Sequence, residues 1–177
     1  MNNVTGIVDE LLQKWDINAT GVKKQTALHM ASFRGHEDVV HVLTKQNAKH
    51  DLKDCDQETA LSLAVFNGHV NTVRLLKAAK ADLDVRDNYG WTLLHRAVNR
   101  GHITAIEILA ELGANLEAQD NNGWTPLQWA AITGYITAIE TLAKLGANLE
   151  AQDNNGRTPL QYAAMNGHIP TIETLAK

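Results

Sequence analysis

Eight histidines and one cysteine are the residues of this sequence best suited to bind a metal or to act in catalysis. Imidazole and thiolate groups hold zinc when three or four of them converge on one point. Four of the histidines instead recur at 33 residues or a multiple of it, at His36, His69, His102 and His168. Such spacing distributes side chains along a structure, and no acid or thiolate converges with them. The sequence therefore predicts no metal site and no cofactor.

Cys55, the only cysteine, lies between Asp54 and Asp56. Neighbouring negative charge disfavours the thiolate, which is the reactive form of cysteine. The sequence also lacks the glycine-rich phosphate loop and the G-x-S-x-G nucleophile motif. We therefore expect a protein that is not an enzyme. A lone cysteine forms no intrachain disulfide, which fits a reducing compartment.

The aromatic side chains offer a different chemistry, which is recognition of a partner. Aromatic residues and arginines are enriched among the residues that dominate the energy of protein interfaces. Several of them repeat at an interval of 33 residues: Trp91 with Trp124, Phe33 with Phe66, and Trp129 with Tyr162. The same interval governs the rest of the chain.

The interval defines a structural unit that starts at a threonine. Threonine recurs at Thr26, Thr59, Thr92, Thr125 and Thr158, and a glycine follows each one nine residues later. Five copies in register, without an insertion, predict an array of small stacked units.

Each unit is expected to contain two helices and a hairpin. The threonine can cap a short helix, with Pro126 at the first helical position and Gln128 completing a capping box in one copy. The glycine ends this helix, and a second amphipathic helix such as ITAIEILAELG follows. The pair Asn122–Gly123 then predicts a tight hairpin turn. Such a unit cannot bury its apolar face alone, so the copies must stack.

The period and the openings TPLQ and TALH resemble the ankyrin repeat. The resemblance implies an all-α repeat fold, an ankyrin-type solenoid of stacked helix-turn-helix units with projecting β-hairpin fingers. We expect residues 1–25 to form a degenerate N-terminal capping repeat. Residues 26–177 are expected to form five repeats, at 26–58, 59–91, 92–124, 125–157 and an incomplete 158–177. Lys24 and Gln57 replace the hairpin glycine of later copies, so the hairpins before Thr26 and Thr59 should be less regular.

Ankyrin proteins usually bind partners through the concave face and the finger tips, and the aromatic and basic residues fall on these positions. The leucine two residues after each threonine and the small residues five and six after it should face the stack. The candidate protein-binding residues are Phe33, Arg34, Phe66, Tyr89, Trp91, Arg96, Arg100, Trp124, Trp129, Arg157, Tyr162 and Met165. Trp91 and Trp124 are expected to project from their hairpins without contributing much to stability.

A structural role is the alternative for part of this set. Trp129 and Tyr162 could be packed between neighbouring helices, and Phe33 and Phe66 could fill space beside irregular hairpins. A purely structural spacer is a third reading of the whole array.

The expected function is that of a non-enzymatic protein-protein interaction module, whose arginines select a protein partner with an acidic epitope. An alternative is the targeting arm of a larger enzyme or bacterial effector whose catalytic part lies beyond Lys177. A net charge of -4 argues against nucleic acid as a partner. The sequence has no run of about 20 apolar residues and no signal peptide, so we expect no membrane insertion and a cytoplasmic location, with the nucleus or a host cytoplasm as alternatives. A monomer is expected, and end-to-end contact through the uncapped C-terminus is the alternative.

Overall fold

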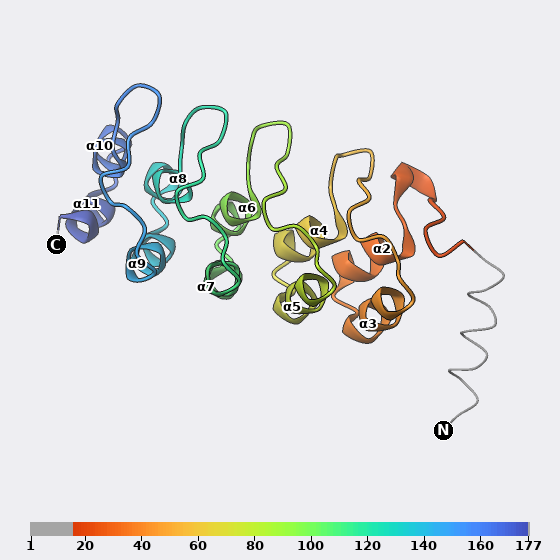
Figure 1. The fold of residues 1–177 in the computed structure, drawn as a ribbon. Helices are drawn as coiled ribbons and strands as arrows, with labels where there is room; N and C mark the ends of the chain where they lie inside the picture. Colours follow the sequence, from red (N-terminus) through yellow and green to blue (C-terminus); the bar gives the residue numbers. More distant parts are fainter. Residues whose placement is uncertain (1–15, 177) are drawn as a thin grey trace.

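The computed structural model describes residues 16–176, which form an elongated row of helix pairs (Figure 1). A short 3-10 helix, η1, precedes them at Val22–Lys24. The α-helices are α2 (Ala27–Arg34), α3 (Glu37–Lys45), α4 (Ala60–Phe66), α5 (Val70–Ala78), α6 (Leu93–Asn99), α7 (Ile103–Glu111), α8 (Pro126–Thr133), α9 (Ile136–Lys144), α10 (Pro159–Met165) and α11 (Ile169–Leu175).

The helices lie in two layers. The first helix of each pair packs beside its counterparts in an inner layer of α2, α4, α6, α8 and α10, and the second helices form an outer layer (Figure 1). Before each pair, the chain projects past the inner layer as a finger. The five fingers are residues 18–25, 51–58, 84–91, 117–124 and 150–157. We call the surface made by the fingers and the exposed side of the inner helices the finger face. The all-α solenoid is thereby confirmed.

Every inner helix begins with the predicted threonine cap. In α8, the Thr125 hydroxyl accepts a hydrogen bond from the backbone N–H of Gln128, whose side chain accepts one from the Thr125 N–H at 2.8 Å. Pro126 is the first residue of this helix, where its missing N–H costs nothing. Ser62, which is shorter than the usual residue, completes the same box with Thr59 at 2.8 Å.

Left-handed residues end the helices. The glycines after the inner helices have φ between 66° (Gly101) and 72° (Gly134). After the outer helices, Gly113 and Gly146 both have a φ of 91°, and Lys80 adopts a φ of 69° at the equivalent point. A lysine there pays about 1–2 kcal/mol that glycine does not.

The core follows the predicted positions. The leucine two after each threonine is fully buried in the first four repeats, as are the residues five and six after it. In the last repeat, Leu160 is half-buried and Ala164 is exposed, because no further helix pair covers them. Ile169 of α11 is 65% exposed for the same reason. Residues 1–15 of the expected N-terminal capping repeat lie outside the described residues.

The fingers differ in detail from the expected β-hairpins. In the fourth finger, Gly123 N–H donates to the Asp120 carbonyl at 3.0 Å, and Asp120 N–H donates to the Trp124 carbonyl at 2.9 Å. Gly123 has a φ of 81°, whereas Asn122 is not left-handed, so the turn is not the two-residue Asn-Gly type. No residue between 16 and 176 is in a β-strand.

The prediction of irregular early fingers is wrong for the second finger. Gln57 takes a φ of 62° and closes the same turn, with its N–H 3.1 Å from the Asp54 carbonyl. The prediction is confirmed for the first finger, where Lys23 and Lys24 are both left-handed, at 61° and 57°. Gly21 there replaces the aspartate that starts the other turns, so its turn lacks the bonds that a carboxylate would supply.

Candidate functional site

An aspartate organises each of the last four fingers; three of the four are buried and Asp87 is half-buried. These residues are Asp54, Asp87, Asp120 and Asp153, again 33 residues apart. In the fourth finger, Asp120 Oδ1 accepts backbone N–H bonds from Asn122 at 2.8 Å and Trp124 at 2.9 Å. The other three make the same pair of bonds. A buried carboxylate needs such partners. The sequence analysis missed these aspartates, although their recurrence at the repeat interval was a signal.

The second carboxylate oxygen binds a side chain from the inner helix that follows the finger. Arg96 donates to Asp87 at 2.9 Å, Trp129 Nε1 donates to Asp120 at 3.1 Å, and the Tyr162 hydroxyl donates to Asp153 at 2.5 Å. Arg96, Trp129 and Tyr162 all stand four residues after the repeat threonine. Three of the predicted binding residues therefore tie a finger to its helix, which matches the structural alternative for Trp129 and Tyr162.

At two joints, the last residue of a finger donates directly to the aspartate of the next one. Trp124 Nε1 donates to the Tyr162 hydroxyl at 2.8 Å and lies 3.3 Å from Asp153 Oδ2. At the other end of the array, Gln25 donates to Asp54 at 3.0 Å. Between these two joints, Arg96 pairs with Glu58, the last residue of the second finger, at 2.6 Å and with Asp87 of the third finger at 2.9 Å.

Ionisation in the Asp153 network follows from these contacts. Burial alone would raise the pKa of Asp153, but hydrogen bonds from the Tyr162 hydroxyl and from backbone N–H groups lower this pKa to about 2. Burial, together with the bond to Asp153, raises the pKa of Tyr162. The pair is thus held as carboxylate and neutral phenol over the whole neutral range.

The aromatic rings of the third finger, the fourth finger, α8 and α10 form one continuous cluster. The ring centroids of Trp91 and Trp129 are 4.8 Å apart, those of Trp124 and Trp129 are 5.2 Å apart, and those of Trp124 and Tyr162 are 5.7 Å apart. Tyr89 lies 6.5 Å from Trp91. Trp91 and Trp124, expected to project from their hairpins, are half-buried against neighbouring rings, and their small contribution to stability stays a prediction.

A hollow of about 570 Å³ opens over this cluster. Its lining residues are Asp87, Tyr89, Trp91, Arg96, Asn121, Asn122, Trp124 and Trp129. They come from the third finger, the fourth finger and the two inner helices that follow these fingers.

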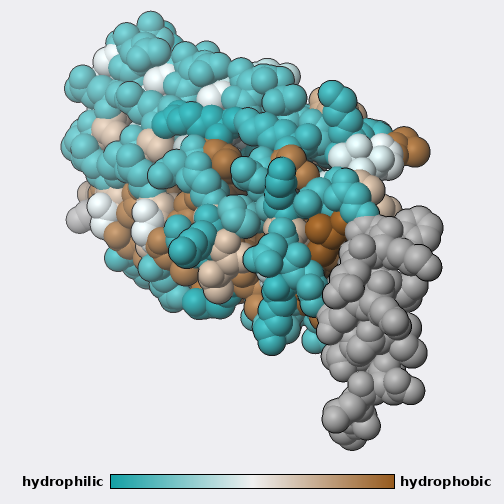
Figure 2. Space-filling view, turned by 45° about the vertical axis from the view of Figure 1, so that its right-hand side comes forward, coloured by the Kyte–Doolittle hydropathy of each residue, from teal (hydrophilic) through white to brown (hydrophobic). Residues whose placement is uncertain are grey.

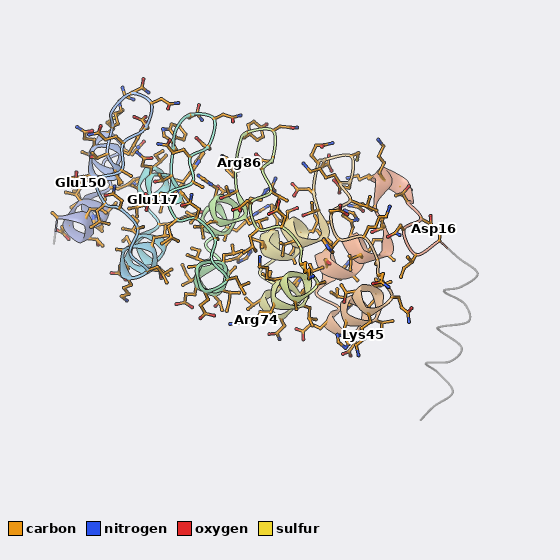
Figure 3. The ribbon with its side chains drawn as sticks, in the orientation of Figure 1. Asp16, Lys45, Arg74, Arg86, Glu117 and Glu150 are labelled. Atoms are coloured by element: carbon orange, nitrogen blue, oxygen red, sulfur yellow. The ribbon has the colours of Figure 1, made fainter. Side chains whose placement is uncertain are left out.

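Backbone and side-chain bonds hold these two fingers together. Asn121 N–H donates to the Tyr89 carbonyl at 3.1 Å, and Arg86, labelled in Figure 3, donates to the Gln119 carbonyl at 2.6 Å. A β-carbon on Gly90 would lie 2.8 Å from Asn121 N, so only glycine allows this approach.

Other predicted binding residues are exposed. Tyr89 is 71% exposed, Met165 62% and Phe33 42%, and Arg34, Arg100 and Arg157 are exposed too. The Arg100 guanidinium lies 3.7 Å from the ring centroid of half-buried Phe66, a cation–π contact. Met30, at 62% exposure, was missed. Figure 2 shows a mostly hydrophilic surface broken by small apolar patches.

The recurring histidines join neighbouring repeats. Nε2 lies within 3.1 Å of a backbone carbonyl 36 residues earlier in His69, His102 and His168. That carbonyl is at the end of the inner helix of the preceding repeat. Among residues 16–176, no three His, Cys, Asp or Glu side chains are grouped as they would be around a metal ion. No helix in that part of the chain is long and apolar enough to cross a membrane.

Comparison with known families agrees with this architecture. A family model described as ankyrin repeats (3 copies) matches residues 1–87, 35–120, 72–153 and 112–177, which together cover the chain. No curated protein matches the sequence. Members of this family generally act as protein-protein interaction modules, typically without catalysis. The chain belongs to the ankyrin-repeat family.

Proposed function

We propose that this chain is a non-enzymatic protein-binding module whose partner lies on the finger face. The observation that carries the proposal is the exposure of Tyr89, Met165 and Phe33 on that face. The neighbouring aromatic residues Trp124, Trp129 and Tyr162 are bonded inside the array. Leaving large apolar side chains in water brings no stability, whereas their burial by a partner is favourable.

Exposed arginines support a partner surface that carries acidic residues. Arg34 and Arg100 are exposed at the ends of inner helices, and Arg157 is exposed on the fifth finger. Arg96 does not contribute, because Glu58 and Asp87 neutralise it. The exposed arginines would mainly raise the association rate with an acidic epitope. We also propose a reducing compartment such as the cytoplasm, which suits the exposed free thiol of Cys55.

The test uses a photo-reactive amino acid placed at position 89 or 165, with position 39 as the control. Val39 is exposed on the outer helix α3, away from the finger face. We expect both finger-face positions to cross-link the same protein in cells, and position 39 not to do so. Cross-linking of that protein only from position 39 would contradict the proposal.

A further inference from the structure

The hollow between the third and fourth fingers is lined by four aromatic and four polar or charged residues. Tyr89, Trp91, Trp124 and Trp129 supply four aromatic rings to its lining. The planes of Trp91 and Trp129 meet at 73°, and those of Trp124 and Trp129 at 86°. Rings set at steep angles surround a rounded group better than a flat one, which would need parallel faces.

The charge around these rings is negative. Asp87 lines the hollow, Asp120 lies against Trp129, and Glu58 is paired with Arg96. Arg96 is the one cation among the lining residues, and two carboxylates neutralise it, at 2.6 and 2.9 Å. Arg86 donates to the Gly90 and Gln119 carbonyls of the same two fingers, so three carboxylates stand against two guanidinium groups. The remaining charge is negative, which favours a cationic ligand and opposes an anionic one.

The carboxylates have little hydrogen-bonding capacity left for a ligand. Asp87 accepts the N–H groups of Tyr89 and Trp91 and a bond from Arg96. Asp120 is 7% exposed, and both of its oxygens are occupied by groups of the chain itself. A guanidinium or a primary ammonium would give up water without finding a free carboxylate acceptor in return. A cation without N–H donors does not meet this cost, and aromatic faces attract such cations.

We propose that this hollow binds a quaternary ammonium group, in the form of a trimethylated lysine side chain of the partner protein. The inference rests on the proposed function, since it assigns a ligand to one part of the finger face. The aromatic walls come from Tyr89, Trp91, Trp124 and Trp129. The negative electrostatic potential comes from Asp87 and Asp120. The acidic residues of the partner would then meet the exposed arginines on either side.

The test compares three probes by the NMR shifts of the indole N–H groups of the full chain. Choline carries the quaternary charge, 3,3-dimethylbutan-1-ol is its neutral isostere, and a glycine-flanked trimethyllysine peptide adds the lysine stem. We expect choline to bind about tenfold more tightly than the isostere, from cation–π attraction worth roughly 1–2 kcal/mol. The peptide should bind more tightly than choline, which separates a protein ligand from a free metabolite.

Variants locate the site. Tyr89→Ala removes an exposed ring and should weaken choline binding severalfold with an unchanged melting temperature, and Trp91→Phe should do the same without emptying the cluster. Tyr135→Ala, at an exposed aromatic residue on the outer layer, is the control and should bind normally. Equal affinity for choline and its isostere, or no shift of any indole signal at tens of millimolar choline, would overturn the proposal. The proposed function would survive either result if the cross-links from the finger face persist.

Discussion

Tyr162→Phe is the sharpest test of the view that the aspartates hold the fingers. The substitution removes one oxygen, which donates to Asp153 Oδ2 at 2.5 Å and accepts from Trp124 Nε1 at 2.8 Å. The ring is retained, so packing in this 5% exposed site changes little. The experiment therefore isolates the hydrogen bonds from the hydrophobic contact.

We expect a loss of about 2 kcal/mol in the free energy of unfolding at pH 7, because a hydrogen bond to a charged group contributes roughly 1.5–3 kcal/mol. The pKa of Asp153 in the folded protein, about 2, should rise toward its ordinary value of 3.8 in the variant. A depressed carboxyl pKa stabilises the fold above the unfolded pKa, and this contribution is lost as the pH falls toward the folded pKa. The difference between wild type and variant should therefore be complete at pH 7 and shrink below about pH 4.

Urea denaturation at pH 7, 5 and 3.5 measures the stability difference, and an NMR titration of the carboxyl carbons measures the pKa of Asp153. A loss that stays the same at all three pH values would refute the reasoning, because it would assign the role of Tyr162 to packing. An unchanged pKa of Asp153 would do so as well.

Three further predictions, on four substitutions, test the joints of the array. Burial lowers the pKa of His95, so below about pH 6.5 the unfolded chain binds a proton that the folded protein resists, and the wild type loses stability. His95→Gln removes this group, so the variant should lose less stability between pH 7 and pH 5.5, as measured by thermal melts at both values. Gly90→Ala should cost about 2–4 kcal/mol in urea denaturation, because the new β-carbon meets Asn121, whereas Gly156→Ala, at nearly the same φ with only a side-chain atom 3.9 Å away, should cost about 1 kcal/mol. Ser62→Gln should raise the unfolding free energy by about 1 kcal/mol, since glutamine at the equivalent position of a later repeat bonds the following finger and serine does not.

Each of these predictions has a result that would contradict it. An acid sensitivity that His95→Gln leaves intact would place the titrating group elsewhere. Equal losses for Gly90→Ala and Gly156→Ala would mean that the close approach of the third and fourth fingers is not rigid. A destabilised Ser62→Gln would mean that this joint has no room for a longer side chain.

The repeat itself could be predicted from the sequence because its signals are local. A threonine, the residue three after it and a glycine nine after it are enough to start and stop an inner helix. The small residues at Ala130 and Ala131 are buried for the reason that their spacing indicated. The error at Gln57 came from treating glycine as necessary, although a glutamine can take the left-handed conformation at a modest cost.

The state of the binding residues could not be predicted in the same way. Whether Trp129 or Arg96 is free depends on an aspartate nine residues earlier, and whether Trp124 is free depends on one 29 residues later. Whether residues so separated in the sequence meet in space depends on how each finger packs against its helix and against the next finger. Residue type and position within the repeat therefore indicated which residues lie on the finger face. They did not separate the residues that hold the fingers from the residues that are exposed.

The central claim is that the exposed side chains of the finger face bind a partner while the bonded ones hold the fingers. The direct measurement is a calorimetric titration with the partner that the cross-linking experiment identifies. It compares the wild type with the triple variant Phe33→Ala, Tyr89→Ala and Met165→Ala, and uses Val39→Ala on the outer layer as the control. We predict a binding loss of about 2 kcal/mol or more for the triple variant, with a melting temperature close to that of the wild type. The Val39→Ala control should bind as tightly as the wild type. Wild-type affinity in a folded triple variant would contradict the claim.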